Sequence, residues 1–87
     1  MNGVIRYAVK MRNGDYMIQD LDDMTPLRVH IHTRDNPIDA DLFKTRENAQ
    51  RCVDETLTCN TNLLVLYDEE NPPQEVVEVK IKYEVGL

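Results

Sequence analysis

Glycine is scarce in this sequence, which contains only three of them. The chain has no glycine-rich phosphate-binding loop, no Gly-x-Ser-x-Gly motif and no His-Glu-x-x-His motif. These patterns mark nucleotide-binding proteins, serine hydrolases and zinc proteases. One glycine, Gly14, belongs to a predicted turn, so few of the flexible loops that an active site needs are left. We therefore expect no enzymatic activity, no catalytic residue and no cofactor.

Cysteine is rarer still, with only Cys52 and Cys59 in the chain. No Cys-x-x-Cys pair is present to bind zinc. If one helix contains both cysteines, they lie about seven residues, or roughly 10 Å, apart along it. That separation is too large for a disulfide. We expect two free thiols, both buried.

Long apolar runs are also absent. The longest, Leu63 to Tyr67, is far below the roughly 20 residues that span a membrane. No basic-then-apolar signal pattern opens the chain, because Arg6 and Lys10 interrupt an alternating stretch. We expect a protein without membrane association, located in the cytoplasm.

Basic residues are outnumbered, with 10 lysines and arginines against 16 acidic residues and a net charge of −6. This balance argues against broad binding to a phosphate backbone, which needs a basic face. One alternative remains open. If the first and last strands were neighbours, a basic face could form and make the chain a nucleic-acid-binding accessory protein; its residues would be Arg6, Lys10, Arg12, Lys80 and Lys82.

Acidic side chains gather in predicted loops. Such carboxylates can imitate a phosphate backbone or meet a basic patch on a partner protein, although they can also serve only to keep a small domain soluble. Pro72 and Pro73 stiffen the chain just after one of the two clusters, which lowers the entropy cost of presenting it. The candidate partner-binding residues are Asp20, Asp22, Asp23, Asp68, Glu69 and Glu70.

The pattern of apolar residues predicts one α+β domain spanning residues 1–87. Strands are expected over residues 4–11, 15–21, 27–32, 63–67 and 77–85, with the first two joined by a two-residue turn at Asn13-Gly14. A helix follows Thr45, a good N-cap residue. The order β-β-β-α-β-β favours an antiparallel sheet of four to five strands with one helix packed on one face.

The helix and the last strand are expected to form most of the core. Helical spacing places Ala49, Cys52, Val53 and Leu57 on the inner side of the helix. The residues expected to be largely buried where helix and sheet meet are Val53, Leu66, Val79, Ile81 and Tyr83. No proline or glycine interrupts the last strand before Gly86. If this strand lies at a sheet edge, it invites pairing with a second copy and hence a homodimer.

Two histidines, His30 and His32, alternate along the third strand and so lie on one face, about 7 Å apart. A third metal ligand would have to come from Asp35, Asp39 or elsewhere, and no spacing rule selects one. Arg28 shares this face, which favours a solvated polar surface. We expect no metal site.

Three stretches of the chain carry a resemblance: Arg6-Tyr7-Ala8-Val9-Lys10, Asn13-Gly14-Asp15-Tyr16 and Phe43-Lys44-Thr45-Arg46-Glu47-Asn48-Ala49. Their layout resembles small accessory proteins encoded by phages and prophages of low-GC Gram-positive bacteria, most of them of unknown function. The resemblance implies a non-enzymatic role against a macromolecule in the host cytoplasm, as in anti-CRISPR and DNA-mimic inhibitors. We expect a small acidic interaction protein that inhibits or modulates a partner protein with a basic surface.

Overall fold

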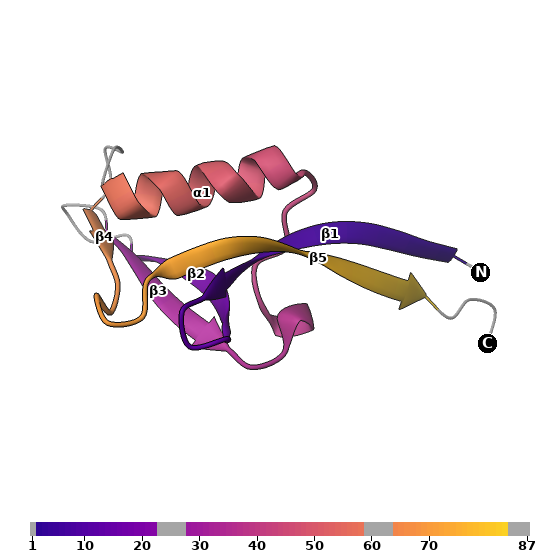
Figure 1. Ribbon diagram of the computed structural model, residues 1–87, viewed down its shortest axis with the longest axis horizontal. Coiled ribbons are helices and arrows are strands. Elements are labelled where there is room, and N and C mark those ends of the chain that lie inside the picture. Colours follow the sequence, from indigo (N-terminus) through magenta and orange to yellow (C-terminus); the bar gives the residue numbers. More distant parts are fainter. Residues whose placement is uncertain (1, 23–27, 59–63, 84–87) are drawn as a thin grey trace.

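A computed structural model describes residues 2–22, 28–58 and 64–83 of the chain. It has one α-helix and a sheet with the strand order β4-β3-β2-β1-β5 (Figure 1), which confirms the α+β class. The elements are β1 (Asn2–Met11), β2 (Tyr16–Asp22), β3 (Arg28–Arg34), a 3-10 turn (Pro37–Asp39), α1 (Arg46–Thr58), β4 (Leu64–Leu66) and β5 (Pro73–Tyr83).

The sheet is mixed, although most of its pairs are antiparallel. β4 runs parallel to β3, with Val29 opposite Val65. A parallel pair needs a long crossover connection, and α1 provides it between these two strands. β4 therefore lies at a sheet edge and not in the centre, and Leu66 is 37% exposed. The expectation that Leu66 is largely buried is wrong.

The β1–β2 hairpin forms where the sequence predicts it, but its turn is longer by one residue. The Gly14 N–H donates to the Met11 carbonyl over 3.0 Å, and the Met11 N–H donates to the Asp15 carbonyl over 2.7 Å. Gly14 has a φ of 94°, a conformation that costs glycine little. This pattern is a three-residue turn with a bulge at the glycine, so the two-residue turn expected at Asn13-Gly14 is wrong.

Residues 41–43 form a wedge that separates β1 from β2 beyond this turn. Phe43 exchanges two backbone hydrogen bonds with Tyr7 of β1, with N···O distances of 2.8 and 2.9 Å. On the other side, the Asp41 N–H donates to the Met17 carbonyl of β2 over 3.1 Å. The Asp41 carboxylate accepts the N–H of Gln19 over 2.7 Å. The wedge thus satisfies backbone groups that β1 and β2 would otherwise offer each other.

Helix α1 begins as predicted and packs on one face of the sheet. The Thr45 hydroxyl accepts the Asn48 N–H over 3.1 Å, which caps the first turn. Leu57, expected inside, is 47% exposed, whereas Thr56 is 1% exposed. Thr56 can be buried because its hydroxyl donates to the Cys52 carbonyl over 2.8 Å. No helix of the described residues is long and apolar enough to span a membrane.

The core lies between α1 and the sheet. Its buried members are Val9, Met11, Met17, Ala49, Cys52 and Val53, with Tyr7, Ile31, Phe43 and Val76 packed against them. Val76, opposite Val9, faces the helix. Val79 is also buried, but because side chains alternate along a strand it faces the other side. The alternating apolar residues of β5 therefore face away from the helix. The expectation that they lie where the helix meets the sheet is wrong.

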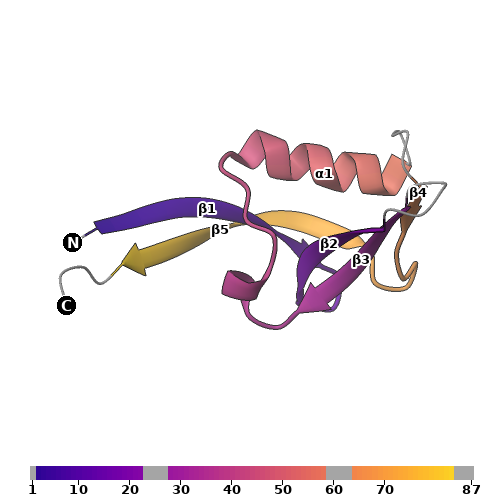
Figure 2. The same cartoon turned by 180° about the vertical axis from the view of Figure 1, so that it is seen from behind.

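The paired strands β1 and β5 continue past the end of α1 as a two-stranded ribbon (Figures 1 and 2). The molecule is accordingly elongated, with extents of 46 × 26 × 22 Å. Ile81 lies in this ribbon and is only half-buried, so the expectation that it belongs to the core is wrong. The side chain of Tyr83 is outside the described residues, as are Cys59, Asp23 and residues 84–87.

This difference in burial predicts different costs for two truncations. Met17→Ala should lower the free energy of unfolding by about 2–5 kcal/mol, because it leaves a cavity under α1. Ile81→Ala should cost less, about 1 kcal/mol, because that side chain is already partly exposed and lies outside the core under α1. Urea denaturation of the two variants measures both values, and a larger loss for Ile81→Ala would contradict the core assignment.

The wedge predicts a special role for the Asp41 carboxylate. Asp41→Ala should lower the free energy of unfolding by about 1–3 kcal/mol, because the Gln19 N–H loses its acceptor. Asp41→Asn keeps an oxygen acceptor and should cost less. The matched control is Asp39→Ala, whose exposed side chain should contribute within about 0.5 kcal/mol. Equal effects at the two positions would rule out this role.

Candidate functional site

One of the two predicted acidic clusters forms an ordered turn. The Asp68 carboxylate accepts the Glu70 N–H over 3.0 Å, and the Asp68 carbonyl accepts the Asn71 N–H over 2.9 Å. Aspartate commonly caps turns in this way. The Asp68 carboxylate thus holds the backbone of the turn in place. Glu69 and Glu70 are exposed. We call Asp68–Asn71 the acidic turn.

The acidic turn is fastened to the β1–β2 hairpin turn. The Asn13 N–H donates to the Asn71 side-chain oxygen over 2.8 Å. One residue away, the Arg12 N–H donates to the Pro72 carbonyl over 2.9 Å. Asn13 is braced in turn, because its side-chain oxygen accepts the Asp15 N–H over 2.9 Å. Two turns that are far apart in the sequence therefore support each other.

The other predicted cluster lies elsewhere. Asp20 is exposed on β2, with its carboxylate 3.8 Å from Nε2 of His32 on β3. Asp22 ends β2, opposite Arg28, and Asp23 lies outside the described residues. β2 leaves the hairpin turn at Tyr16, so Asp22 is at its far end, about 20 Å along the strand. Asp20 and Asp22 are therefore not part of the acidic turn.

The histidine rings of β3 stack on each other. The centroids of His30 and His32 are 6.2 Å apart, with an angle of 15° between the ring planes. Asp35 and Asp39, the candidate third ligands, lie in the segment after β3. Among the residues that the structure describes, no group of three or more histidine, cysteine, aspartate or glutamate side chains is placed to hold a metal ion.

The basic residues do not gather on one face, although β1 and β5 are neighbours. Opposite residues in a sheet share a face. Arg6 lies opposite Val79, whereas Lys80 lies opposite Ile5, which points to the other side of β1. Lys10 faces the same way as Arg6, and Lys82 faces the same way as Lys80. The face that the nucleic-acid alternative requires is therefore split in two.

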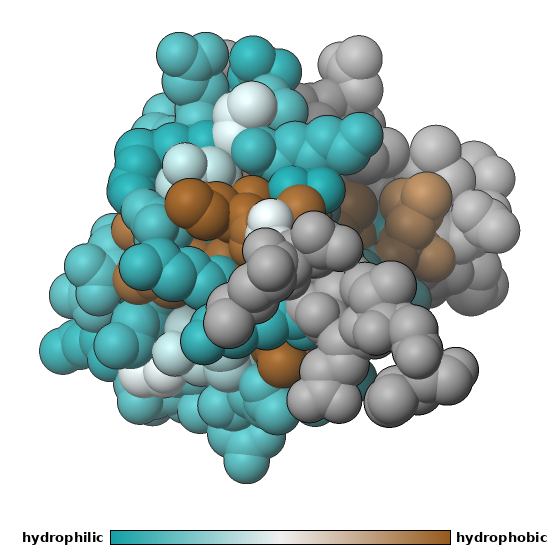
Figure 3. Space-filling model, turned by 90° about the vertical axis from the view of Figure 1, so that its right-hand side faces the viewer, coloured by the Kyte–Doolittle hydropathy of each residue, from teal (hydrophilic) through white to brown (hydrophobic). Residues whose placement is uncertain are grey.

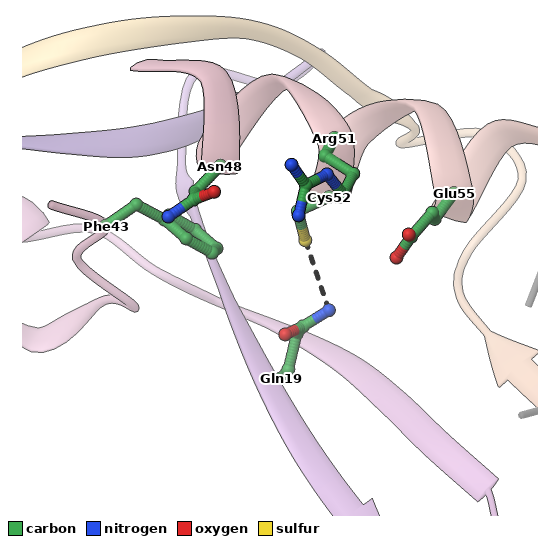
Figure 4. A pocket seen from close by; sticks show the side chains of 6 residues that line it. All are labelled: Gln19, Phe43, Asn48, Arg51, Cys52 and Glu55. Atoms are coloured by element: carbon green, nitrogen blue, oxygen red, sulfur yellow. Dashed lines mark hydrogen bonds between the residues drawn. The ribbon is translucent and has the colours of Figure 1, made fainter. Parts of the chain in front are cut away.

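A hollow of about 360 Å³ opens between α1 and β2 (Figure 4). At its floor, Nε2 of Gln19 donates to the sulfur of Cys52 over 3.1 Å. Arg51 and Glu55, one helical turn apart, stand on its rim. The wedge helps to shape the hollow, because Asp41 bonds to the backbone of Gln19 and Phe43 is itself part of the wedge. The lining residues are Gln19, Phe43, Asn48, Arg51, Cys52 and Glu55.

Cys52 is buried, as expected, and its thiol is a poor nucleophile. Burial raises the pKa of this thiol to about 11, and the negative charges of Asp41 and Glu55 act in the same direction. Since the thiolate is the reactive form, the group stays protonated and unreactive near neutral pH. The hollow thus has a positive and a negative side chain on its rim but lacks an activated cysteine.

Several residues that shape these features escaped prediction. Asp41 and Gln19 gave no signal, because single polar residues beside apolar ones occur throughout the sequence. Asn71 had a weak signal, since an asparagine before Pro72 is typical of turns. Its contact with Asn13 joins segments 58 residues apart, and no local pattern encodes such a contact.

The raised thiol pKa predicts how stability depends on pH. The folded protein holds this proton more tightly than the unfolded chain does, whose thiol has the ordinary pKa of 9.0. The resulting stabilisation is fully present below pH 9 and is lost as the pH rises towards 11. The difference in unfolding free energy between the wild type and Cys52→Ala should therefore shrink over this range, by up to about 2 kcal/mol.

Urea denaturation at several pH values measures this difference. Val53→Ala is the matched control, because it removes a neighbouring buried side chain that does not titrate. The difference between the wild type and Val53→Ala should stay constant from pH 9 to pH 11. The same constancy for Cys52→Ala would show that the thiol does not titrate differently in the folded protein.

Comparison with known proteins adds no relative to this description. No family model matches the chain, and no curated protein or solved structure is significantly similar to it. What the protein does is therefore inferred from its own residues.

Proposed function

We propose that this chain is a small, non-enzymatic interaction protein that binds a partner protein with a basic surface through the acidic turn. Binding there would inhibit or modulate the partner. Anti-defence proteins and DNA-mimic inhibitors, the functions that the resemblance to phage accessory proteins implies, act in this manner.

The observation that carries the proposal is the ordered state of the acidic turn. The Asp68 carboxylate accepts the Glu70 N–H within the turn, and the Asn71 side-chain oxygen accepts the N–H of Asn13 in the hairpin turn. Just after the turn, the Pro72 carbonyl accepts the Arg12 N–H. Binding costs free energy whenever flexible groups become fixed. A turn that is already held in place avoids much of that cost. Glu69 and Glu70 are exposed on it and available for a partner.

Charge supports a basic partner. The net charge of −6 repels other acidic surfaces and attracts basic ones over a distance set by the salt concentration. Complementary charge mainly increases the rate of association and the specificity of a complex. The acidic turn would therefore act in the encounter with the partner as well as in the final contact.

Other features support a binding role over a catalytic one. The Cys52 thiol stays protonated near neutral pH, since burial raises its pKa, and this argues against a catalytic cysteine. The basic residues of β1 and β5 are divided between two faces, which argues against the nucleic-acid alternative. The edge strand β5 favours one further partner, which is a second copy of this chain.

The test compares two charge-reversed variants of equal net charge. The first, Glu69→Lys with Glu70→Lys, changes the acidic turn but keeps Asp68, whose carboxylate holds the backbone. The matched control, Asp35→Lys with Asp39→Lys, changes two exposed residues of the segment after β3. A partner captured from cell lysate by the wild type should also be captured by the control and be lost with the first variant.

The purified partner then allows association rates to be measured against salt. We expect the Glu69/Glu70 variant to associate at least about tenfold more slowly than the wild type at low salt. Its rate should also depend less on salt. Equal rates and equal salt dependence for the three proteins would mean that the acidic turn only aids solubility. Tight retention of the wild type on heparin would favour the nucleic-acid alternative instead.

A further inference from the structure

The free edge of β5 can be assigned residue by residue. Tyr7 directs its N–H and carbonyl towards Phe43, away from β5. Glu78 lies opposite Tyr7. In an antiparallel pair, two residues that lie directly opposite each other either exchange both backbone hydrogen bonds or both point their backbone groups away from each other. Tyr7 and Glu78 form a pair of the second kind. The N–H and carbonyl of Glu78 therefore point outward, and those of Val76, Lys80 and Lys82 do the same by alternation.

A side-chain contact supports this assignment. The guanidinium of Arg46 donates to the Val76 carbonyl over 3.3 Å, so that carbonyl is not used by β1. Beyond Val76, no strand of the described residues pairs with the outer edge of β5. The outward groups from Glu78 to Lys82 thus form a row of donors and acceptors that can receive another strand.

The end of the ribbon is also short of packing partners. α1 does not extend over it (Figures 1 and 2). A shallow hollow of about 200 Å³ lies there among Val4, Ile5 and Ile81, and Ile5 is 46% exposed. In the view along the ribbon, hydrophobic side chains gather in the middle of the surface (Figure 3). Since a two-stranded ribbon is marginally stable in water, an added strand would stabilise it.

We propose that two copies of this chain pair antiparallel along β5, about a twofold axis that passes through Val79. In this register Glu78 of each copy lies directly opposite Lys80 of the other, and the outward backbone groups of both residues meet. On the other face, Val77 lies opposite Ile81 of the second copy. The two sheets join into one continuous sheet, and both ribbons gain a neighbouring strand.

Charge selects this register over its neighbours. An axis through Lys80 would place Lys80 opposite its own copy, and an axis through Glu78 would do the same for that carboxylate. Like charges directly opposite each other destabilise a strand pair, whereas opposite charges stabilise it. The axis through Val79 avoids both repulsions and forms two opposite-charge pairs. Since Glu78 and Lys80 are both exposed in one copy, their charges can be changed without disturbing the fold.

The test is a charge swap measured by sedimentation equilibrium from about 1 to 500 μM. Glu78→Lys and Lys80→Glu each turn two attractive pairs into two repulsive ones. Each variant should raise the dimer dissociation constant about tenfold or more. The double variant restores both attractive pairs and should dimerise like the wild type. A mixture of the two single variants should form a mixed dimer, since the two chains then carry complementary charges.

Lys82→Glu is the matched control, because Lys82 lies opposite the apolar Val76 of the second copy. It should change the dissociation constant by less than about threefold. A wild type that stays monomeric over this range overturns the proposal. So does a dimer that the single variants leave unchanged, or one that the double variant fails to restore. Circular dichroism of each variant verifies that the fold is intact.

The dimer and the acidic turn are separate surfaces. The Glu69/Glu70 variant should dimerise like the wild type, and the Lys80→Glu variant should still capture the partner protein. A failure of one proposal can therefore be told apart from a failure of the other.

Discussion

The hydrogen bonds on both sides of residues 41–43 are the constraint on which the rest of this fold depends. Phe43 occupies the backbone groups of Tyr7, and Asp41 occupies those of Met17 and Gln19. Because the backbone N–H and carbonyl of Tyr7 point towards the wedge, β5 bonds to the residues before and after Tyr7 in β1. This determines which backbone N–H and carbonyl groups of β5 point outward. The wedge also holds Gln19, which donates to Cys52 at the floor of the hollow between α1 and β2.

Two surfaces follow from this arrangement, and they use charge differently. The acidic turn concentrates carboxylates of one sign on a braced backbone, which suits long-range attraction of a partner. The β5 edge alternates a carboxylate and an ammonium group at Glu78 and Lys80, which suits the choice of one register at short range. The first surface lies where the hairpin turn and the β4–β5 connection meet, and the second lies along the ribbon.

Local features of this fold could be predicted from the sequence, and non-local ones could not. The Thr45 cap and the glycine of the hairpin turn follow from steric and hydrogen-bonding preferences of single residues. Alternation shows which residues of β5 share a face, but it cannot tell what covers that face. The prediction that the apolar residues of β5 lie under α1 was wrong for this reason. The short run around Leu66 suits an edge strand as well as a central one. The wedge depends on Asp41, whose role is set by a strand more than twenty positions away.

The same holds for the acidic residues. The sequence identified Glu69 and Glu70 together with Asp20 and Asp22, because all lie in polar stretches between apolar ones. Only the contact between Asn71 and Asn13 shows that one cluster is braced, and only the bounds of β2 show that Asp20 and Asp22 belong to a strand and not to this turn.

The pairing of β1 with β5 also governs the order in which the chain can fold. Asn2 lies opposite Tyr83, so β1 has its longest partner in a strand that is far away along the sequence. Such distant pairings slow folding, because the connecting loop must close before the contacts form. The hairpin, the wedge and α1 can form earlier, which makes the ribbon the last part of the molecule to be completed.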